Sequence, residues 1–231
     1  MSRQSTPAFF TPHCMLCDAV GMGDRGICQG CLDDLPWNRH ACLGCALPLP
    51  DLTSSGTLCG KCQKSHPHFD RTLAPLKYER EVAPLISGFK FRNRLEYGKL
   101  LTQILADFLE EHIDHRPELL LPVPLHKNRL RERGYNQSLE IAHLLSKRFG
   151  IPIDFQSLQR HRDTEHQSEL NYTDRRKNIK HAFTLTQPLN IKSVALIDDV
   201  ITTGETVAEI SRLLKRGGVQ QVDVWALART P

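Results

Sequence analysis

The sequence predicts an α/β protein, in which helices flank a parallel sheet, preceded by a small domain that metal ions stabilise. Three observations support this fold class. From about residue 69 onward, apolar runs of strand length alternate with segments whose apolar residues recur at helical spacing. One apolar run, residues 194–197, leads into the acids Asp198 and Asp199 and then into a loop rich in threonine and glycine. The 8 cysteines all stand before Gln63, as CxxC pairs.

The cysteine pairs indicate zinc sites. The pairs are Cys14/Cys17, Cys28/Cys31, Cys42/Cys45 and Cys59/Cys62. One CxxC turn presents two thiolates to a metal ion, and two turns complete a tetrahedral four-cysteine zinc site. Glycine and proline punctuate the segments between the pairs, so this region buries too little apolar surface to fold alone, and zinc would supply the missing stability. We therefore expect two structural zinc sites without catalysis.

Loop length favours one assignment of the pairs to the two zinc ions. Sequential pairing closes two short loops, whereas interleaved pairing needs longer ones and is the second choice. A redox CxxC motif, or a single zinc ion with spare thiols, are the competing interpretations. The change in composition after the last pair predicts a double zinc-ribbon domain at residues 1–68 and an α/β domain at residues 69–231.

Composition and charge exclude some classes of protein. The formal net charge of +4 permits contact with nucleic acid but does not require it. No run of eighteen apolar residues is present, and residues 1–12 lack the apolar region of a signal peptide. We therefore expect a cytoplasmic protein without membrane insertion, in a compartment where structural disulfides are rare.

The acid pair and the loop after it predict a ribose-phosphate site. A buried parallel strand would place Asp198 and Asp199 at its carboxyl end, where open α/β sheets bind their ligands. Residues 202–206 open the next helix, so their backbone N–H groups and hydroxyls can hold a phosphate. Gly204 leaves room for the anion. Acids for sugar hydroxyls beside a phosphate cradle suit a ribose 5-phosphate; the alternative is an ordinary strand–turn–helix corner.

The remaining elements follow from apolar spacing. We expect strands at 71–78, 119–125, 151–158 and 222–228, and helices at 81–89, 95–112, 138–149 and 205–215. Asn136 would introduce the helix at 138–149. Two groups of cations could either contact phosphate or lie on a solvated face. One group is Lys90, Arg92 and Arg94, and the other is Arg131 and Arg133.

Several segments together resemble a known family. Residues 194–206, VALIDDVITTGET, resemble the signature of type I phosphoribosyltransferases, which bind 5-phosphoribosyl 1-pyrophosphate (PRPP). With the cysteine pairs, PVPL at 122–125, RERGYNQS at 131–138 and HQSELNYTDRRKNIKHAF at 166–183, the chain resembles the ComF/GntX family from residue 14 to 229. The resemblance implies a type I phosphoribosyltransferase fold behind a double zinc ribbon.

The resemblance also assigns roles to residues. It implies that Asp198 and Asp199 are the catalytic acids and hold the ribose 2′- and 3′-hydroxyls. The 5′-phosphate would lie on Thr202, Thr203, Gly204, Glu205 and Thr206. The loop after the first core strand would bind pyrophosphate through Lys127 and Arg129.

The resemblance also implies a lid segment and a bound Mg²⁺ ion. Residues 160–181 are polar and cationic, and the resemblance implies a lid over PRPP with Arg175 and Arg176 as its cations; a solvated basic helix is the alternative. Mg²⁺, bound mostly through PRPP oxygens and waters, would neutralise the leaving pyrophosphate. The zinc ions would have no part in this chemistry.

The family implies a process but not a reaction. Its members serve natural competence, meaning DNA uptake or the use of DNA as a nutrient. Three functions stay open: a phosphoribosyltransferase (a glycosyltransferase) with an unknown acceptor, a PRPP sensor without turnover, and an adaptor that passes single-stranded DNA to uptake or recombination proteins. Only 6% of residues are aromatic, which weighs against strong autonomous binding of single strands. We rank ribose-phosphate binding first.

Overall fold

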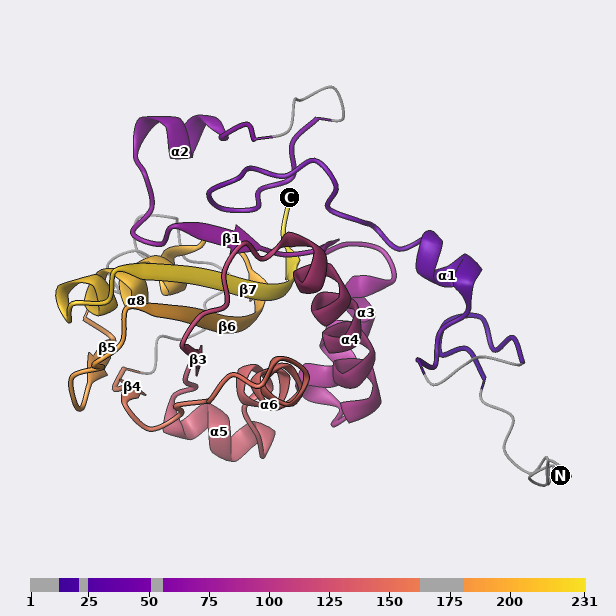
Figure 1. Cartoon of the computed structure of the whole chain (residues 1–231). Helices are drawn as coiled ribbons and strands as arrows, with labels where there is room; N and C mark the ends of the chain where they lie inside the picture. The colour runs from indigo at the N-terminus through magenta and orange to yellow at the C-terminus, as the bar shows by residue number, and fades with distance from the viewer. Residues whose placement is uncertain (1–12, 21–24, 51–55, 163–180) are drawn as a thin grey trace, which may run out of the picture. The chain divides into compact units, whose positions relative to one another are not determined.

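The computed structural model describes residues 13–20, 25–50, 56–162 and 181–231 (Figure 1). Its contacts divide the chain into two compact units, Met1–Leu35 and Pro36–Pro231. The second group of cysteines therefore falls in the same unit as the sheet. The domain boundary that we expect after residue 68 stays a prediction.

The larger unit is built on a parallel sheet of five strands, as the sequence predicts (Figure 1). Its central strands are β6 (Ser193–Ile201) and β7 (Gln221–Arg229), which pair in parallel along most of their length. Strand β3 (Leu119–Pro122) pairs with the other edge of β6, and both β1 (Arg71–Leu73) and β2 (Leu76–Lys77) pair with β7. The sheet places the acid-bearing strand in its centre.

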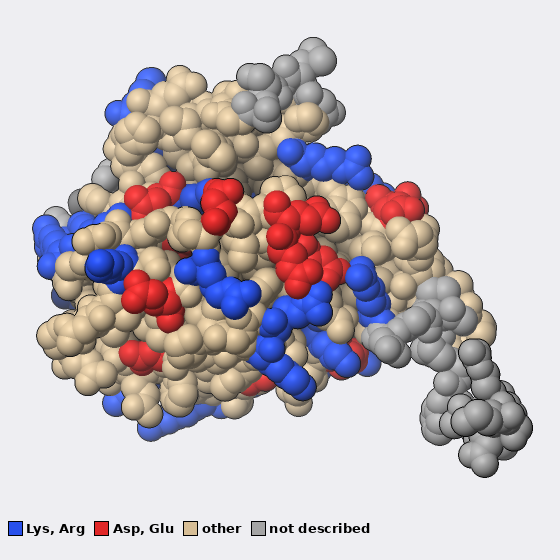
Figure 2. All heavy atoms as spheres, viewed as in Figure 1, with Lys and Arg blue, Asp and Glu red and all other residues tan. Residues whose placement is uncertain are grey.

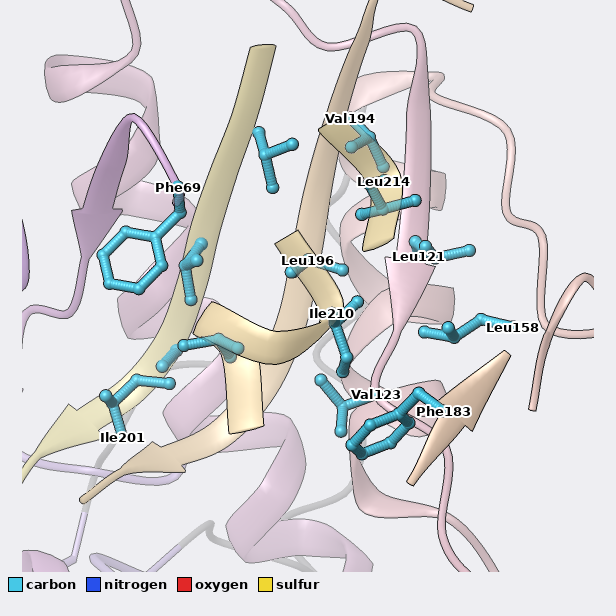
Figure 3. Packing of buried hydrophobic residues seen from close by; sticks show 14 of the residues in the cluster. Phe69, Leu121, Val123, Leu158, Phe183, Val194, Leu196, Ile201, Ile210 and Leu214 are labelled. Carbon is cyan, nitrogen blue, oxygen red and sulfur yellow. The ribbon is translucent and has the colours of Figure 1, made fainter. Parts of the chain in front are cut away.

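Helices cover both faces of this sheet, which explains why its strands are apolar on both sides. On one face lies α8 (Glu205–Arg216), whose Ile210 and Leu214 pack with Leu196 of β6 and Leu121 of β3 (Figure 3). On the other face α6 (Gln137–Phe149) contacts β6 and β3, and its Phe149 meets the buried Trp225 of β7, with ring centroids 6.2 Å apart. The α/β fold class is confirmed.

The helices before α6 form a connected layer. Helix α4 (Leu95–His112) has the bounds that the apolar spacing predicts, and it packs against α6 and against α3 (Val82–Phe91). A Cβ atom at Gly98 would lie 2.4 Å from the Phe89 ring, so the crossing of α3 and α4 requires a glycine there. None of the described helices is both long and apolar enough to cross a membrane.

Three expected elements differ in the structure. The strand expected at 71–78 is two short strands, because Pro75 has no N–H and the Ala74 carbonyl accepts from the Asn38 side chain instead. The strand expected at 151–158 is wrong: one parallel bridge joins Ile153 to Leu120, and the Asp154 side chain then accepts two backbone N–H groups in a turn.

The third difference follows β3. The segment expected as a loop forms the helix α5 (Lys127–Arg133), capped by the His126 side chain and ended by Gly134 at φ 79°. The expected lid is flanked by β4 (Leu158–Arg160) and β5 (Phe183–Leu185), which pair antiparallel. Most of that segment, residues 163–180, lies outside the described residues.

Candidate functional site

The cysteines gather into two groups of four, with all ligand atoms of a group within 4.8 Å of one another. The groups are Cys14, Cys17, Cys28 and Cys31, here called the first cluster, and Cys42, Cys45, Cys59 and Cys62, the second cluster. The grouping is the sequential one that loop length favours. Four thiolates in a closed set suit a structural zinc ion.

The two clusters are built as copies of one module. An isolated antiparallel bridge brackets the first pair in each, His13 to Val20 and Ala41 to Pro48. The residue after each first pair has positive φ, 60° at Asp18 and 53° at Ala46. The second pair of each cluster begins a short helix, α1 (Gln29–Asp33) or α2 (Gly60–Lys64). A duplicated turn therefore explains the spacing of the cysteines.

The backbone prepares the cysteines for a metal. The Cys28 N–H points to the Cys14 sulfur at 3.4 Å, and the Cys59 N–H points to the Cys42 sulfur at 3.2 Å. Burial alone would raise the pKa of each accepting thiol, but backbone N–H groups outweigh it and lower the pKa of Cys14 to about 6 and that of Cys42 to about 7. These thiols therefore favour the thiolate form that zinc requires.

The acid pair lies within β6, which runs two residues beyond it before the chain turns. Asp199 is 8% exposed, and its Oδ1 lies 2.8 Å from Nζ of Lys90 at the end of α3. Asp198 Oδ1 accepts from the Ser138 hydroxyl at 3.3 Å and from the Asp199 backbone N–H at 2.9 Å. Three elements thus converge on the two carboxylates.

The environment of Asp198 favours its neutral form. Burial is the first cause and the neighbouring Asp199 charge the second, and together they raise the pKa of Asp198 to about 7. Lys90 and the hydrogen bonds to the carboxylate act in the opposite direction without cancelling them. Asp198 can therefore hold its proton near neutral pH.

The loop after β6 has the geometry of an anion cradle. Gly204 adopts φ 77° and caps the twelve-residue helix α8 without a side chain. The Thr203 hydroxyl accepts from the Glu205 N–H at 3.4 Å. Glu205 and Thr206 belong to the first turn of α8, where N–H groups and the helix dipole favour negative charge. A Cβ atom at Gly204 would meet nothing closer than Ile201, at 3.9 Å, so glycine is required here by its backbone angle and not by lack of space.

The expected pyrophosphate cations lie on α5. Lys127 and Arg129 occupy its first turn, so a helix carries them where the sequence predicts a loop. Arg133 at its end donates to Gln137 at 3.1 Å and places its guanidinium 4.9 Å from the centre of the Phe91 ring. Burial lowers the pKa of Arg133, while the nearby charges of Asp199 and Arg129 act in opposite directions on it.

The sequence does not reveal several residues that surround the acid pair and the loop after β6. The sequence leaves Lys90 and Arg133 undecided between phosphate contact and a solvated face, and it assigns no role to Ser138. Arg229, at the end of β7, was also missed, although a cation in a buried apolar strand is a usable signal. Arg175 and Arg176 lie outside the described residues, so their expected place over the ligand stays a prediction.

Comparison with known proteins agrees with the two-part organisation. A double zinc ribbon domain model matches residues 6–64, and a phosphoribosyl transferase domain model matches residues 136–231. Bound zinc therefore fits both the family model and the two four-cysteine clusters.

Curated relatives match over nearly the whole chain. Competence protein F of Haemophilus influenzae is 35% identical over 96% of this chain and 98% of its own. DNA utilization protein YhgH of Escherichia coli K12 is 35% identical over 94% of this chain and 96% of its own. Competence protein ComFC of Bacillus subtilis is 26% identical, with full coverage of both chains. The chain belongs to the ComF/GntX family, with a double zinc ribbon ahead of a phosphoribosyltransferase domain.

Proposed function

We propose that this protein binds PRPP, or a related ribose 5-phosphate, in the service of DNA uptake or utilisation in the cytoplasm. One observation carries the ligand: an acid pair on the central strand, with Asp199 buried and Asp198 half-buried, is followed by a glycine-capped helix N-terminus. The relatives named for competence and DNA utilization support the process.

Different residues would bind the ribose, the 5′-phosphate and the pyrophosphate of this ligand. Asp198 and Asp199 would accept hydrogen bonds from the two ribose hydroxyls, and residues 202–206 would donate to the 5′-phosphate. Lys90 pairs with Asp199 in the free protein and would favour the charged form of both acids when the hydroxyls bind. Lys127 and Arg129, with Arg175 and Arg176, are the cations proposed for pyrophosphate.

If the chain turns over its ligand, the reaction class is phosphoribosyl transfer to an acceptor base. Pyrophosphate would leave as positive charge develops on the ribose, and the carboxylates of Asp198 and Asp199 would stabilise that charge. Mg²⁺ would supply charge neutralisation on the pyrophosphate oxygens. PRPP sensing without turnover uses the same residues.

A second candidate is an adaptor for single-stranded DNA and its uptake or recombination partners. One observation favours it: Phe91 is 65% exposed, lies beside Lys90 and Arg92 in sequence, and has the Arg133 guanidinium over its ring. Exposed aromatics among cations suit stacked bases. Against a strong interface, Figure 2 shows acidic and basic side chains interspersed on the face in view.

A panel of ligands tests the proposal. Zinc-loaded protein would be heated with PRPP and Mg²⁺, ribose 5-phosphate, pyrophosphate or inorganic phosphate, and the unfolding midpoint compared with a ligand-free control. The proposal predicts the largest rise with PRPP and a smaller one with ribose 5-phosphate. Stabilisation by pyrophosphate and phosphate alone would contradict ribose recognition.

Pyrophosphate release distinguishes the enzyme from the sensor. Protein, PRPP and Mg²⁺ would be incubated with a panel of nucleobases; release that depends on one base identifies the acceptor, and binding without release identifies a sensor. The adaptor predicts instead that a labelled single strand binds with steep salt dependence, that Phe91→Ala weakens it, and that Asp198→Asn does not.

A further inference from the structure

Arg229 joins the second cluster to the loop after β6. This arginine is only 6% exposed. Its Nε donates to the Cys45 carbonyl at 3.1 Å. Its Nη1 donates to the Ile201 carbonyl at 3.2 Å and also to the Thr202 carbonyl. One side chain therefore contacts a zinc-ligating residue and the start of the loop that we assign to the 5′-phosphate.

Other contacts run along the same path. Nζ of Lys61, in α2 between two second-cluster cysteines, lies 3.3 Å from Oε1 of Glu205 in the first turn of α8. Cys45 also packs against the same apolar core as Ile201 and Val207. The second cluster and the loop are thus in direct contact within one compact unit.

The buried guanidinium of Arg229 requires that its hydrogen-bond acceptors stay in place. A buried cation is strongly destabilising when it lacks hydrogen-bond partners, and arginine presents its donors in a rigid planar fork. Nη1 also donates to the carbonyl and hydroxyl oxygens of Thr230, whereas Nε donates to the Cys45 carbonyl, so the complete set of bonds forms only while the Cys45 turn and the loop hold their positions together. Zinc fixes the Cys45 turn, so loss of zinc would leave a buried donor without its acceptor and release the loop.

We propose that Arg229 is a positioning residue that couples zinc in the second cluster to the conformation of the phosphate loop. Zinc and the ribose phosphate then bind cooperatively, each raising the affinity for the other. The ligand part of this inference rests on the proposed function; the loop part does not. The first cluster belongs to the other compact unit and serves as an internal control.

The first experiment needs no ligand. Hydrogen exchange would follow amides 202–206 in full-length protein, comparing native chain with Arg229→Met and with Cys42→Ser/Cys45→Ser. We expect faster exchange in both variants, with the amides of β6 and β7 near Leu196 and Val224 still protected. Cys14→Ser/Cys17→Ser and Arg148→Met, which removes an exposed ion pair with Glu110, should leave amides 202–206 unchanged.

Two results would overturn the coupling. Unchanged exchange at 202–206 in the Arg229 and second-cluster variants would show that the loop is independent of the metal. Equal loss of protection at 202–206 and in β6 and β7 would show that Arg229 stabilises the whole fold and positions nothing. Arg229→Lys, which keeps the charge without the fork, should resemble Arg229→Met.

The second experiment uses linkage in the chain with an intact second cluster. Equilibrium competition with a zinc chelator would be measured on Cys14→Ser/Cys17→Ser protein with and without saturating PRPP. We expect PRPP to raise the zinc affinity roughly five- to hundredfold, and not to raise it in the chain that also carries Arg229→Met. Equal zinc affinity with and without PRPP, in protein that binds PRPP, overturns the inference.

The two experiments separate the two proposals. Faster loop exchange on zinc loss, in a protein that never binds PRPP, leaves the coupling standing and removes the proposed ligand. Firm PRPP binding with a loop indifferent to zinc leaves the ligand standing and removes the coupling.

Discussion

Nζ of Lys90 lies 2.8 Å from Oδ1 of Asp199, joining the end of α3 to the centre of the sheet. Both side chains are mostly shielded from solvent, 18% and 11% exposed. The contact holds Lys90, a residue type that usually lies in solvent, beside two adjacent carboxylates. It also predicts the consequences of removing either partner.

Lys90→Met should destabilise the folded protein by about 1–3 kcal/mol, because Asp199 would be left buried beside Asp198 without its cation. Urea unfolding of the zinc-loaded protein measures this change. Combining Lys90→Met with Asp199→Asn should recover part of the loss, as expected for a coupled pair. Losses that simply add would show that the two side chains do not interact.

Stability should fall as pH rises from 6 to 8 through the pKa of Asp198. The folded protein holds that proton up to about pH 7, while the unfolded chain has already released it, so folding favours the protonated state. The stability from this group is full below the unfolded pKa and is lost as pH rises through the folded one, a loss on the order of 1 kcal/mol between pH 6 and 8.

The variant Asp198→Asn isolates this contribution. The difference in unfolding free energy between native and variant chains, measured at several pH values with zinc bound, should change across this window. A difference that stays constant from pH 6 to 8 would show that Asp198 is fully ionised at neutral pH.

Gly204→Ala should affect the ligand through backbone angle alone. Forcing alanine into the left-handed region costs about 1–2 kcal/mol, and open space around the site adds no clash. Gly150→Ala is the matched control, since Gly150 has φ 66° and an equally open surrounding. Both should lose similar stability in thermal unfolding, but only Gly204→Ala should weaken PRPP binding. Equal effects on binding would remove the cradle assignment.

Metal content should follow the two clusters independently. Native mass spectrometry should find two zinc ions per chain, and one in either Cys31→Ser or Cys62→Ser protein. Only Cys62→Ser should lower the unfolding midpoint of the unit that contains the sheet, because the second cluster packs into that unit. A lowered midpoint in Cys31→Ser protein as well would contradict this division.

Local pattern was sufficient to predict the parallel sheet, helix α4 and both cysteine clusters. Each depends on short-range rules: apolar periodicity in residues 95–112, and paired thiols joined by short loops. The acid pair and the glycine-capped helix follow one another in sequence, so their adjacency in space was also predictable.

What sequence could not supply depends on tertiary contact. Lys90 meets Asp199 only because α3 ends against the centre of the sheet, a contact between segments far apart along the chain. Arg229 acquires its role from carbonyls of two distant segments. The strand expected at 151–158 was wrong because Asp154 accepts backbone N–H groups in a turn that apolar spacing does not reveal.

Calorimetric titration with PRPP and Mg²⁺ is the decisive test of the ribose-phosphate site. Zinc-loaded native protein would be compared with Asp198→Asn/Asp199→Asn, and with Asp154→Asn as a control carboxylate outside the site. We expect saturable binding by the native and control proteins and its loss in the double variant. Absence of binding by folded native protein, or equal binding by the double variant, would contradict a ribose-phosphate site on β6.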